Sequence, residues 1–401
     1  MISKNKQSAQ TKKTQNKALS DGVPVGWREA CPPQNWRRVK LGDVAEINPL
    51  ERLEKNSIAK KIPMEALEPF QRNISFFLEK EFKGGVKFRN GDTLVARITP
   101  SLENGKTAFV DVLNENEVGF GSTEFIVLRK KENITDEKFI YYLARSFDFR
   151  ELAIKSMTGT SGRQRVQTNE VINYRFLLPP LPEQKAIAEA LSSLDDKIDL
   201  LHRQNKTLEN MAQALFRKWF IDETDEGWEI GKLSDIVDVS SGKGLKKDEY
   251  IVNGKYSVLG ANGKIGRTNK YLLDEKVIFT GRVGTLGNVF IFDGKVWLSD
   301  NTLIIKPKAK HFYFVYFLLK TKNLKEMNVG STQPLIRQSD LKNIAVFLPP
   351  KNILQDFENK MGDFFVKIDN NQSQICTLEN LRDTLLPKLM SGEVRVKDFT
   401  K

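Results

Sequence analysis

Hydrophobic residues recur at alternating steps of three and four through two stretches of this chain, residues 181–220 and 351–390. This spacing is typical of a helix with an a/d heptad seam. The two stretches align without a gap, so that Lys197-Ile198-Asp199 falls on Lys367-Ile368-Asp369. Each stretch follows a Leu-Pro-Pro phrase, and proline fits the first turn of a helix but not its interior. The pattern therefore predicts two long helices that arose by duplication.

Neither predicted seam is stable alone in water, because each presents an apolar stripe along about five heptads. We expect each helix to bury the seam of the other, as an antiparallel coiled coil with a pseudo-twofold axis. The alternative is that each helix packs only on its own globular neighbour.

Two asparagines interrupt the seams and suggest a register. Asn205 lies at an a position and Asn371 at a d position, and these positions face each other in an antiparallel pair. The register that joins them also pairs Leu201 with Ile375, and its clear flaw is Leu194 beside Arg382. A slip of one heptad would leave a buried amide unpaired, at about 1–3 kcal/mol for each amide. We expect the asparagine pair to fix the register; the alternative is that both amides lie at a wet edge and have no such role.

The two segments that precede the predicted helices are rich in short strands and also repeat one another. The phrase that begins at Trp36 has a counterpart at Trp228, with a leucine five positions on and an aspartate two further in both. Short β-rich runs cut by Gly, Asn and Asp follow in the same order in both segments, which indicates strands and hairpins. The sequence thus predicts a duplicated fold whose loops differ between the copies.

These patterns predict an α/β (α+β) fold, in which two globular domains with mixed, β-rich cores are separated by the two long helices as a pseudo-twofold internal repeat. The predicted divisions are a disordered basic tail and leading segment (1–35), a first domain (36–180), a first long helix and linker (181–227), a second domain (228–349), and a second long helix with a C-terminal tail (350–401).

Positive charge is concentrated outside the helices. The chain carries 63 Lys+Arg against 51 Asp+Glu. Segment 228–349 has 19 basic and 11 acidic residues, whereas segment 181–227 has 6 and 10. Basic surfaces attract nucleic acid or, less often, an anionic membrane. No apolar run approaches the roughly 18 residues of a membrane span, and no signal peptide begins the chain, so we expect a cytoplasmic protein that does not contact a membrane.

The sequence contains no readable catalytic site. The Pro-Pro pairs follow Cys31, Leu178 and Leu348, so the Asn/Asp-Pro-Pro-aromatic tetrapeptide of base methylation is absent. Gly105-Lys106-Thr107 ends like a phosphate-binding loop, but Pro100 stands where the first glycine should be. Two cysteines are too few for a cysteine-based metal site. We therefore expect no cofactor, no metal and no catalysis by this chain alone.

The order of domain, Pro-Pro, long helix, domain, Pro-Pro, long helix resembles the specificity (S) subunit of type I restriction-modification systems. The phrases that carry this resemblance are Leu178–Gln184, Ala214–Phe220, Gly281–Asn288 and the Gly330–Gln338 loop. Lys351-Asn352 departs from the usual opening of the second helix. The resemblance covers roughly residues 36–395. It implies two target-recognition domains that each read one half of a split sequence in double-stranded DNA. It also implies that the helices dock two methyltransferase (M) subunits and that a motor-endonuclease (R) subunit joins for cleavage.

The loops supply residue types that contact DNA. Arg and Lys suit guanine, Asn and Gln suit adenine, and Ser, Thr and backbone amides suit phosphate. The candidates in the first domain are Arg97, Thr99, Ser101, Lys106, Ser161, Arg163, Gln164 and Arg165. The candidates in the second domain are Lys243, Lys246, Lys247, Arg267, Thr268, Asn269, Arg282, Thr285, Gln333 and Arg337. We favour the Arg163–Arg165 loop and Arg267–Asn269; the equivalent Arg97 and Arg282 could equally form structural ion pairs.

Two other functional classes stay open at this point. One is a coiled-coil adaptor protein whose basic surface is incidental, and the other is an enzyme whose site has no recognisable motif.

Overall fold

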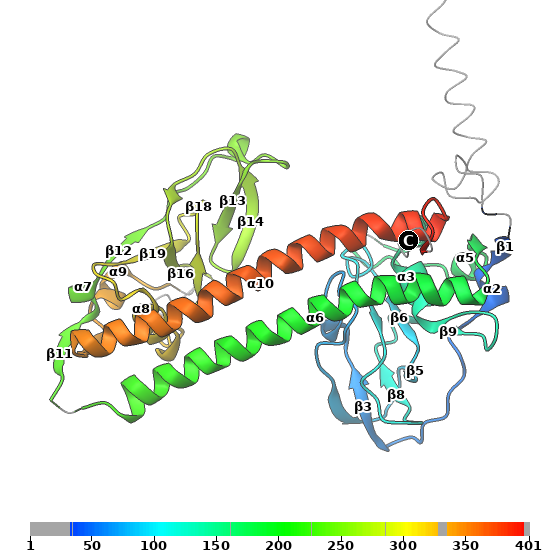
Figure 1. Cartoon of the computed structure of the whole chain (residues 1–401), viewed down its shortest axis with the longest axis horizontal. Helices are drawn as coiled ribbons and strands as arrows, with labels where there is room; N and C mark the ends of the chain where they lie inside the picture. The colour runs from blue at the N-terminus through cyan, green and yellow to red at the C-terminus, as the bar shows by residue number, and fades with distance from the viewer. Residues whose placement is uncertain are drawn as a thin grey trace, which may run out of the picture. The chain divides into compact units, whose positions relative to one another are not determined.

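The structure is a computed structural model that describes residues 33, 35–160, 162–225, 227–284, 286–327 and 335–396. It divides into two compact units. Unit 1 is formed by the described residues up to Leu201 and from Ser373 onwards, and unit 2 by those from His202 to Gln372. Each unit contains one sheet-rich domain and one part of each long helix, α6 (Leu181–Arg217) and α10 (Lys351–Ser391) (Figure 1). The predicted tail at residues 1–32 lies outside the described residues.

Domain 1, the sheet-rich part of unit 1, is built from three sheets. A four-stranded antiparallel sheet has the order β2-β9-β6-β7, a mixed sheet has the order β4-β3-β8-β5 with β3 parallel to β8, and β1 pairs with β10. The strands are β1 (Arg37–Lys40), β2 (Ala45–Ile47), β3 (Ile58–Ile62), β4 (Leu78–Glu81), β5 (Val86–Phe88), β6 (Thr93–Ala96), β7 (Thr107–Phe109), β8 (Gly119–Gly121), β9 (Phe125–Lys130) and β10 (Arg175–Leu178). The helices are α2 (Leu41–Val44), α3 (Glu137–Arg145), α4 (Phe147–Lys155) and α5 (Thr168–Ile172), with a 3-10 turn η2 (Met64–Ala66).

Domain 2, the sheet-rich part of unit 2, repeats this topology strand for strand. Its sheets have the orders β12-β19-β16-β17, β14-β13-β18-β15 and β11-β20, and the parallel pair is β13 with β18. The strands are β11 (Glu229–Lys232), β12 (Val237–Ser241), β13 (Tyr256–Gly260), β14 (Gly263–Thr268), β15 (Leu273–Asp274), β16 (Val277–Gly281), β17 (Val289–Phe292), β18 (Lys295–Leu298), β19 (Thr302–Pro307) and β20 (Ala345–Leu348). The helices are α7 (Leu233–Ile236), α8 (Phe312–Thr321) and α9 (Gln338–Lys342), with a 3-10 turn η4 (Lys247–Glu249). The predicted α/β fold with an internal repeat is confirmed.

One helix in each domain joins the sheet to the long helices. In domain 1, Asp136 caps α3 by accepting hydrogen bonds from the backbone N–H groups of Lys138 and Phe139, both at 3.0 Å. Every residue of α3 from Phe139 to Arg145 is buried. The α8 helix is the counterpart in domain 2, and it packs on β17 and β19. Helices in this position touch both a sheet and a long helix, which explains why they are apolar around most of their circumference.

The start of α6 is fixed by a buried side chain. α6 begins directly after Pro179-Pro180, as predicted, and Gln184 is fully buried in its first turns. The Gln184 amide accepts a hydrogen bond from Asp136 N and donates to the carbonyls of Ile134 and Pro179. A buried amide must satisfy both its donor and its acceptor, so Gln184 anchors α6 to domain 1. At its other end α6 passes into one π turn, η3 (Lys218–Asp222).

The two long helices pack against each other within both units, in an antiparallel arrangement. In unit 1, Ile198 and Leu201 of α6 cluster with Ile375 and Leu378 of α10. In unit 2, Asn371 donates a hydrogen bond from Nδ2 to Oδ1 of Asn205 at 2.8 Å. Farther along unit 2, the rings of Trp219 and Phe357 lie 5.9 Å apart. The contact between the asparagines is the one that the proposed register requires; its role in fixing that register stays a prediction.

The apparent flaw of the seam, Arg382, has a partner that the heptad pattern did not indicate. Arg382 is buried in unit 1, and its Nη1 lies 2.7 Å from Oδ1 of Asp195, the residue next to Leu194 on α6. Buried charges are tolerated when they are paired and hydrogen-bonded. The seam therefore contains a buried ion pair where the sequence suggested an unsatisfied arginine.

Candidate nucleic-acid interface

Two loops of domain 1 that carry predicted DNA-contacting residues lie side by side. The loop after β6 and the segment before α5 meet through an isolated bridge between Ile98 and Arg165. The backbone N–H of Thr99 donates to the carbonyl of Gln164 at 3.0 Å, and that of Val166 donates to the carbonyl of Arg97 at 2.8 Å. Residues about 65 positions apart in the sequence are thus brought to one edge of the domain.

The two arginines of the second loop differ in what holds them. Arg165 forms hydrogen bonds with both carboxylate oxygens of Glu124, at 2.6–3.0 Å. The hydrogen bonds from Arg165 lower the pKa of the Glu124 carboxyl. The Arg163 side chain is exposed and makes no hydrogen bond or ion pair with another described residue, although the backbone N–H of Arg163 donates to the carbonyl of Thr160. Arg163 is therefore available for a ligand, whereas Arg165 shapes the loop.

The other candidates of domain 1 are partly used by the fold. Arg97 donates from Nη2 to the carbonyl of Val166 at 3.2 Å, and Lys106 donates from Nζ to the carbonyl of Met64 at 3.0 Å. Thr99 Oγ1 lies 3.5 Å from the sulfur of Met157, and Ser101 is half-buried. Ser161 lies outside the described residues. Arg97, Thr99 and Lys106 therefore use part of their side-chain contacts within domain 1.

Two residues that the sequence reasoning missed complete this region. The guanidinium of Arg150 lies 4.7 Å from the centre of the Phe70 ring and donates to the carbonyl of Glu103 at 3.2 Å. Phe70 donates from its backbone N–H to the carbonyl of Gly105 at 3.1 Å. Both residues therefore hold the loop that ends at Gly105. No periodic pattern marks Phe70, and the basic charge of Arg150 lies on an amphipathic helix where it looks like an ordinary surface residue.

Domain 2 builds the same loop pair with other side chains. An isolated bridge joins Val283 to Leu335, and the backbone N–H of Ile336 donates to the carbonyl of Arg282 at 2.9 Å. The amide of Asn288 donates to Oδ1 of Asn262 at 2.9 Å, which brings the exposed turn between β13 and β14 next to the loop. The sequence reasoning missed Asn262 and Asn288. A short-range signal did exist, because Asn262-Gly263 is a hairpin turn dipeptide.

Three predicted residues of domain 2 lie where β14 ends and the next turn begins. Arg267 donates from Nε and Nη2 to the carbonyls of Gly254 and Lys255, and Asn269 Oδ1 accepts a hydrogen bond from the backbone N–H of Lys255. Thr268 is buried. No described contact joins this turn to the loop pair. The favoured Arg267–Asn269 set thus has a local structural use, and the buried Thr268 side chain does not face solvent.

Four further candidates of domain 2 are exposed. Lys243, Lys246, Lys247 and Arg337 all reach solvent. Arg337 precedes α9, where its backbone N–H donates to Asp340 at 2.9 Å. Thr285 and Gln333 lie outside the described residues.

Arg97 and Arg282 occupy equivalent positions, as the sequence indicates. Each follows the end of an inner strand of its four-stranded sheet, and each has a buried Nε with no hydrogen-bond partner among the described residues. No acidic side chain in the described part of the chain forms an ion pair with either arginine. A buried donor without a partner is uncommon, which makes both arginines candidates for an acceptor supplied by a ligand.

Metal-binding clusters and membrane-spanning helices are both absent from the described residues. No group of three or more His, Cys, Asp or Glu side chains in these ranges could hold a metal ion. None of the described helices is long and apolar enough to cross a membrane.

Comparison with known families explains the duplicated architecture. The family model for the type I restriction modification DNA specificity domain matches this chain twice, over residues 33–210 and 225–380. The chain belongs to this family. The two matches cover most of both units, and each ends within a long helix.

Relatives in this family match over much of their length. The MjaIX specificity subunit of a type I restriction enzyme of Methanocaldococcus jannaschii is 30% identical over 311 residues, which cover 67% of this chain and 71% of the relative. The MjaVIII specificity subunit from the same organism is 25% identical, over 92% of this chain and 95% of the relative. A solved structure of a type I S subunit from M. genitalium has the same fold, with a TM-score of 0.58 and 18% identity over 92% of this chain and 98% of that one. A DNA specificity role is supported, and the adaptor alternative is not favoured.

Proposed function

We propose that each domain of this specificity subunit reads one half of a split sequence in double-stranded DNA. The observation that carries the proposal is the loop pair, which recurs at the same place in two domains of identical strand order. The scaffolds match while the loop side chains differ, with Arg163 and Gln164 in domain 1 and Asn262 and Asn288 in domain 2. Identical scaffolds with different loops give one fold two specificities.

The proposed contacts fall into two groups. Exposed, unpaired side chains such as Arg163 are available for base edges or phosphates. Arg97 in domain 1 and Arg282 in domain 2 each lie next to the loop pair of their domain. Their guanidinium groups are partly buried. The other predicted residues remain part of the proposed DNA-binding set, except that Thr268 contributes through its backbone because its side chain is buried.

The long helices set the separation of the two half-sites in this proposal. A rise of 1.5 Å per residue makes a helix of this kind a spacer of fixed length, and half-site spacing mirrors protein symmetry in dimeric DNA readers. The Asn205–Asn371 hydrogen bond supports one register of the pair. The two predicted domains, residues 36–180 and 228–349, are the parts that would be exchanged between family members.

The chain itself is proposed to be non-catalytic and to act in the cytoplasm within a larger enzyme. Methyltransferase subunits would dock on the helix pair, and a motor-endonuclease subunit would join for cleavage.

Co-expression with the methyltransferase subunit tests the proposed function. Methylated adenines would then be mapped on genomic DNA. We expect a split motif, with two short specific sequences separated by a spacer of fixed length. A stable protein complex with unmodified DNA would instead support an adaptor, and a continuous motif would contradict the division of the sequence between two domains.

A further inference from the structure

The end of α10 covers a corner of unit 1 with an arginine. This corner, which we call the first corner, contains Trp36 beside Glu183 of α6. The Trp36 indole N–H donates to Glu183 Oε2 at 3.0 Å. Arg395, from the segment after α10, donates to both oxygens of Glu183 at 2.7 and 2.6 Å. Gly392, with a φ of +76°, lies so close that a Cβ there would be 2.8 Å from Pro33. The chain thus closes the first corner with its own C-terminal segment.

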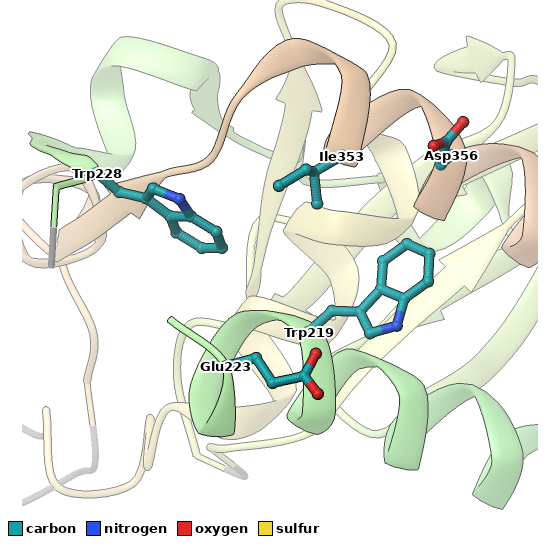
Figure 2. Close-up of a pocket in the computed structure, with 5 residues that line it drawn as sticks. All are labelled: Trp219, Glu223, Trp228, Ile353 and Asp356. Atoms are coloured by element: carbon teal, nitrogen blue, oxygen red, sulfur yellow. The ribbon is translucent and has the colours of Figure 1, made fainter. Parts of the chain in front are cut away.

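The equivalent corner of unit 2 is an open cavity of about 250 Å³. This second corner is lined by Trp219, Glu223, Trp228, Ile353 and Asp356 (Figure 2). Trp219 lies in η3 and Glu223 directly follows it, whereas Ile353 and Asp356 come from the first turns of α10. Trp228 precedes β11 as Trp36 precedes β1.

A comparison of the two repeats shows which residues of the first corner are absent from the second corner. Arg395 and Glu183 of the first corner correspond, at the offset of the helices, to Asp225 and Ile353. The internal arginine is therefore absent, and the Trp228 indole N–H has no acceptor among the described residues. A carboxylate is nevertheless present one helical turn further along α10, at Asp356, and it makes no ion pair or hydrogen bond with another described residue.

Two indoles and two carboxylates around a cavity of this size favour one type of side chain. A guanidinium stacks on indole faces by cation–π attraction and binds carboxylates through charge-assisted hydrogen bonds. Its flat, weakly hydrated surface suits such a site better than a lysine ammonium does. The Glu223 carboxylate lies 3.8 Å from Lys218 Nζ, and in unit 1 the Glu393 carboxylate lies 3.9 Å from Lys388 Nζ, so this surface pair is shared by both corners. The features specific to the second corner are its second indole, Trp219, and the Asp356 carboxylate.

We propose that the second corner binds an arginine side chain of a protein partner, in the place that Arg395 takes in the first corner. The partner that we assign is the methyltransferase subunit, and this assignment rests on the proposed function. The two ends of the helix pair then differ, because one is closed by the chain itself and the other is completed by a partner.

The test compares affinities of the full-length chain for its methyltransferase subunit. Removing both charges with Glu223→Gln and Asp356→Asn should weaken binding about tenfold, because a desolvated guanidinium loses its paired charges. Asp225→Arg should weaken binding to a similar degree, since it restores an internal arginine that competes for the cavity. Asp293→Asn, at an exposed position in the turn between β17 and β18 and away from the helix pair, should leave the affinity unchanged.

The controls separate failure of this inference from failure of the proposed function. Thermal unfolding should show that all four forms fold alike. If the wild-type chain and the Glu223→Gln/Asp356→Asn variant bind the methyltransferase subunit equally well, the arginine site is wrong and the proposed function stands. If the wild-type chain does not bind the methyltransferase subunit at all, the proposed function itself fails and this inference fails with it.

Discussion

The two domains contact the long helices through equivalent positions. The contact is polar and charged in unit 1, whereas it is aromatic in unit 2. In unit 1, the hydroxyl of Tyr142 on α3 donates to Oδ2 of Asp195 at 2.7 Å, and Arg382 of α10 donates to Oδ1 of the same carboxylate at 2.7 Å. In unit 2, the counterparts of these residues are Phe317, Phe365 and Ala212. The rings of Phe317 and Phe365 lie 6.2 Å apart in an edge-on arrangement. We call the contacts of unit 1 the polar junction and those of unit 2 the aromatic junction. The buried polar network of the first is thus replaced by an aromatic cluster in the second.

This difference shows that the backbone arrangement does not depend on either chemistry. Burying an ion pair costs desolvation energy that its attraction roughly offsets, so replacing the whole pair with apolar groups is often neutral. Removing only one partner is costly, because a buried charge then lacks a partner. The aromatic junction has no such requirement and draws its stability from buried area and ring contacts. Single substitutions should therefore act differently in the two units.

The largest effect is expected in the aromatic junction. Phe357 is fully buried and contacts the rings of Phe216, Trp219, Phe220 and Phe317. Phe357→Ala should lower the free energy of unfolding by about 3–5 kcal/mol, because a large cavity remains. Urea denaturation measures this change. Val366→Ala, at an exposed position on the same helix, is the matched control and should have little effect. A small effect of Phe357→Ala would mean that the cluster is not the core of this junction.

The polar junction should be sensitive to charge. Asp195→Asn keeps the size of the side chain but removes the charge that pairs with Arg382, and we expect a loss of about 1.5–3 kcal/mol. The triple variant Tyr142→Phe/Asp195→Phe/Arg382→Ala, which copies unit 2, should recover most of this loss. Equal destabilisation by the single and the triple variants would contradict the view that the two chemistries are interchangeable.

A smaller effect is expected where the helices meet in unit 2. Asn371→Leu should leave the buried Asn205 amide without a partner and cost about 1–3 kcal/mol. Asn205→Leu/Asn371→Leu should be at least as stable as either single variant, since both amides are then removed. Urea denaturation of the two single variants and the double variant gives the coupling energy. Additive losses would show that the amides act independently and do not set the register.

The sequence predicted those features that repeat with a fixed period. The long helices, their antiparallel pairing and the Asn205–Asn371 contact all follow from an ungapped duplication of the seam. The partner of Arg382 could not be predicted, because Asp195 lies beside the seam and its position depends on how α3 packs. The parallel pairing of β3 with β8 joins strands that no local pattern relates.

Candidate DNA contacts were predictable as residue types on loops but not as individual roles. Arg163 and Arg165 look alike in the sequence, yet only Arg165 is held by Glu124, a residue 41 positions away. Arg267 likewise resembles a DNA contact in the sequence, but its guanidinium donates hydrogen bonds to two backbone carbonyls. Such uses depend on distant backbone positions, which composition and spacing do not encode.

Loss of a single DNA contact should have the smallest effect and should be confined to one domain. Arg163→Ala should reduce the slope of log K against log salt by about 0.9 if the arginine neutralises one phosphate. It should also relax recognition of only one half-site. Fluorescence anisotropy at several salt concentrations measures the slope. Lys80→Ala, at an exposed position on the edge strand β4, is the control and should leave the slope unchanged. An unchanged slope for Arg163→Ala would remove this arginine from the DNA-binding set.

The division of specificity between two separate domains is tested most directly by a domain exchange. Residues 36–180 would be replaced with the corresponding domain of another family member, and the chimera would be co-expressed with the methyltransferase subunit. Sequencing of methylated genomic DNA should show one new half-site, with the other half-site unchanged. A change in both half-sites, or in neither, would contradict the account.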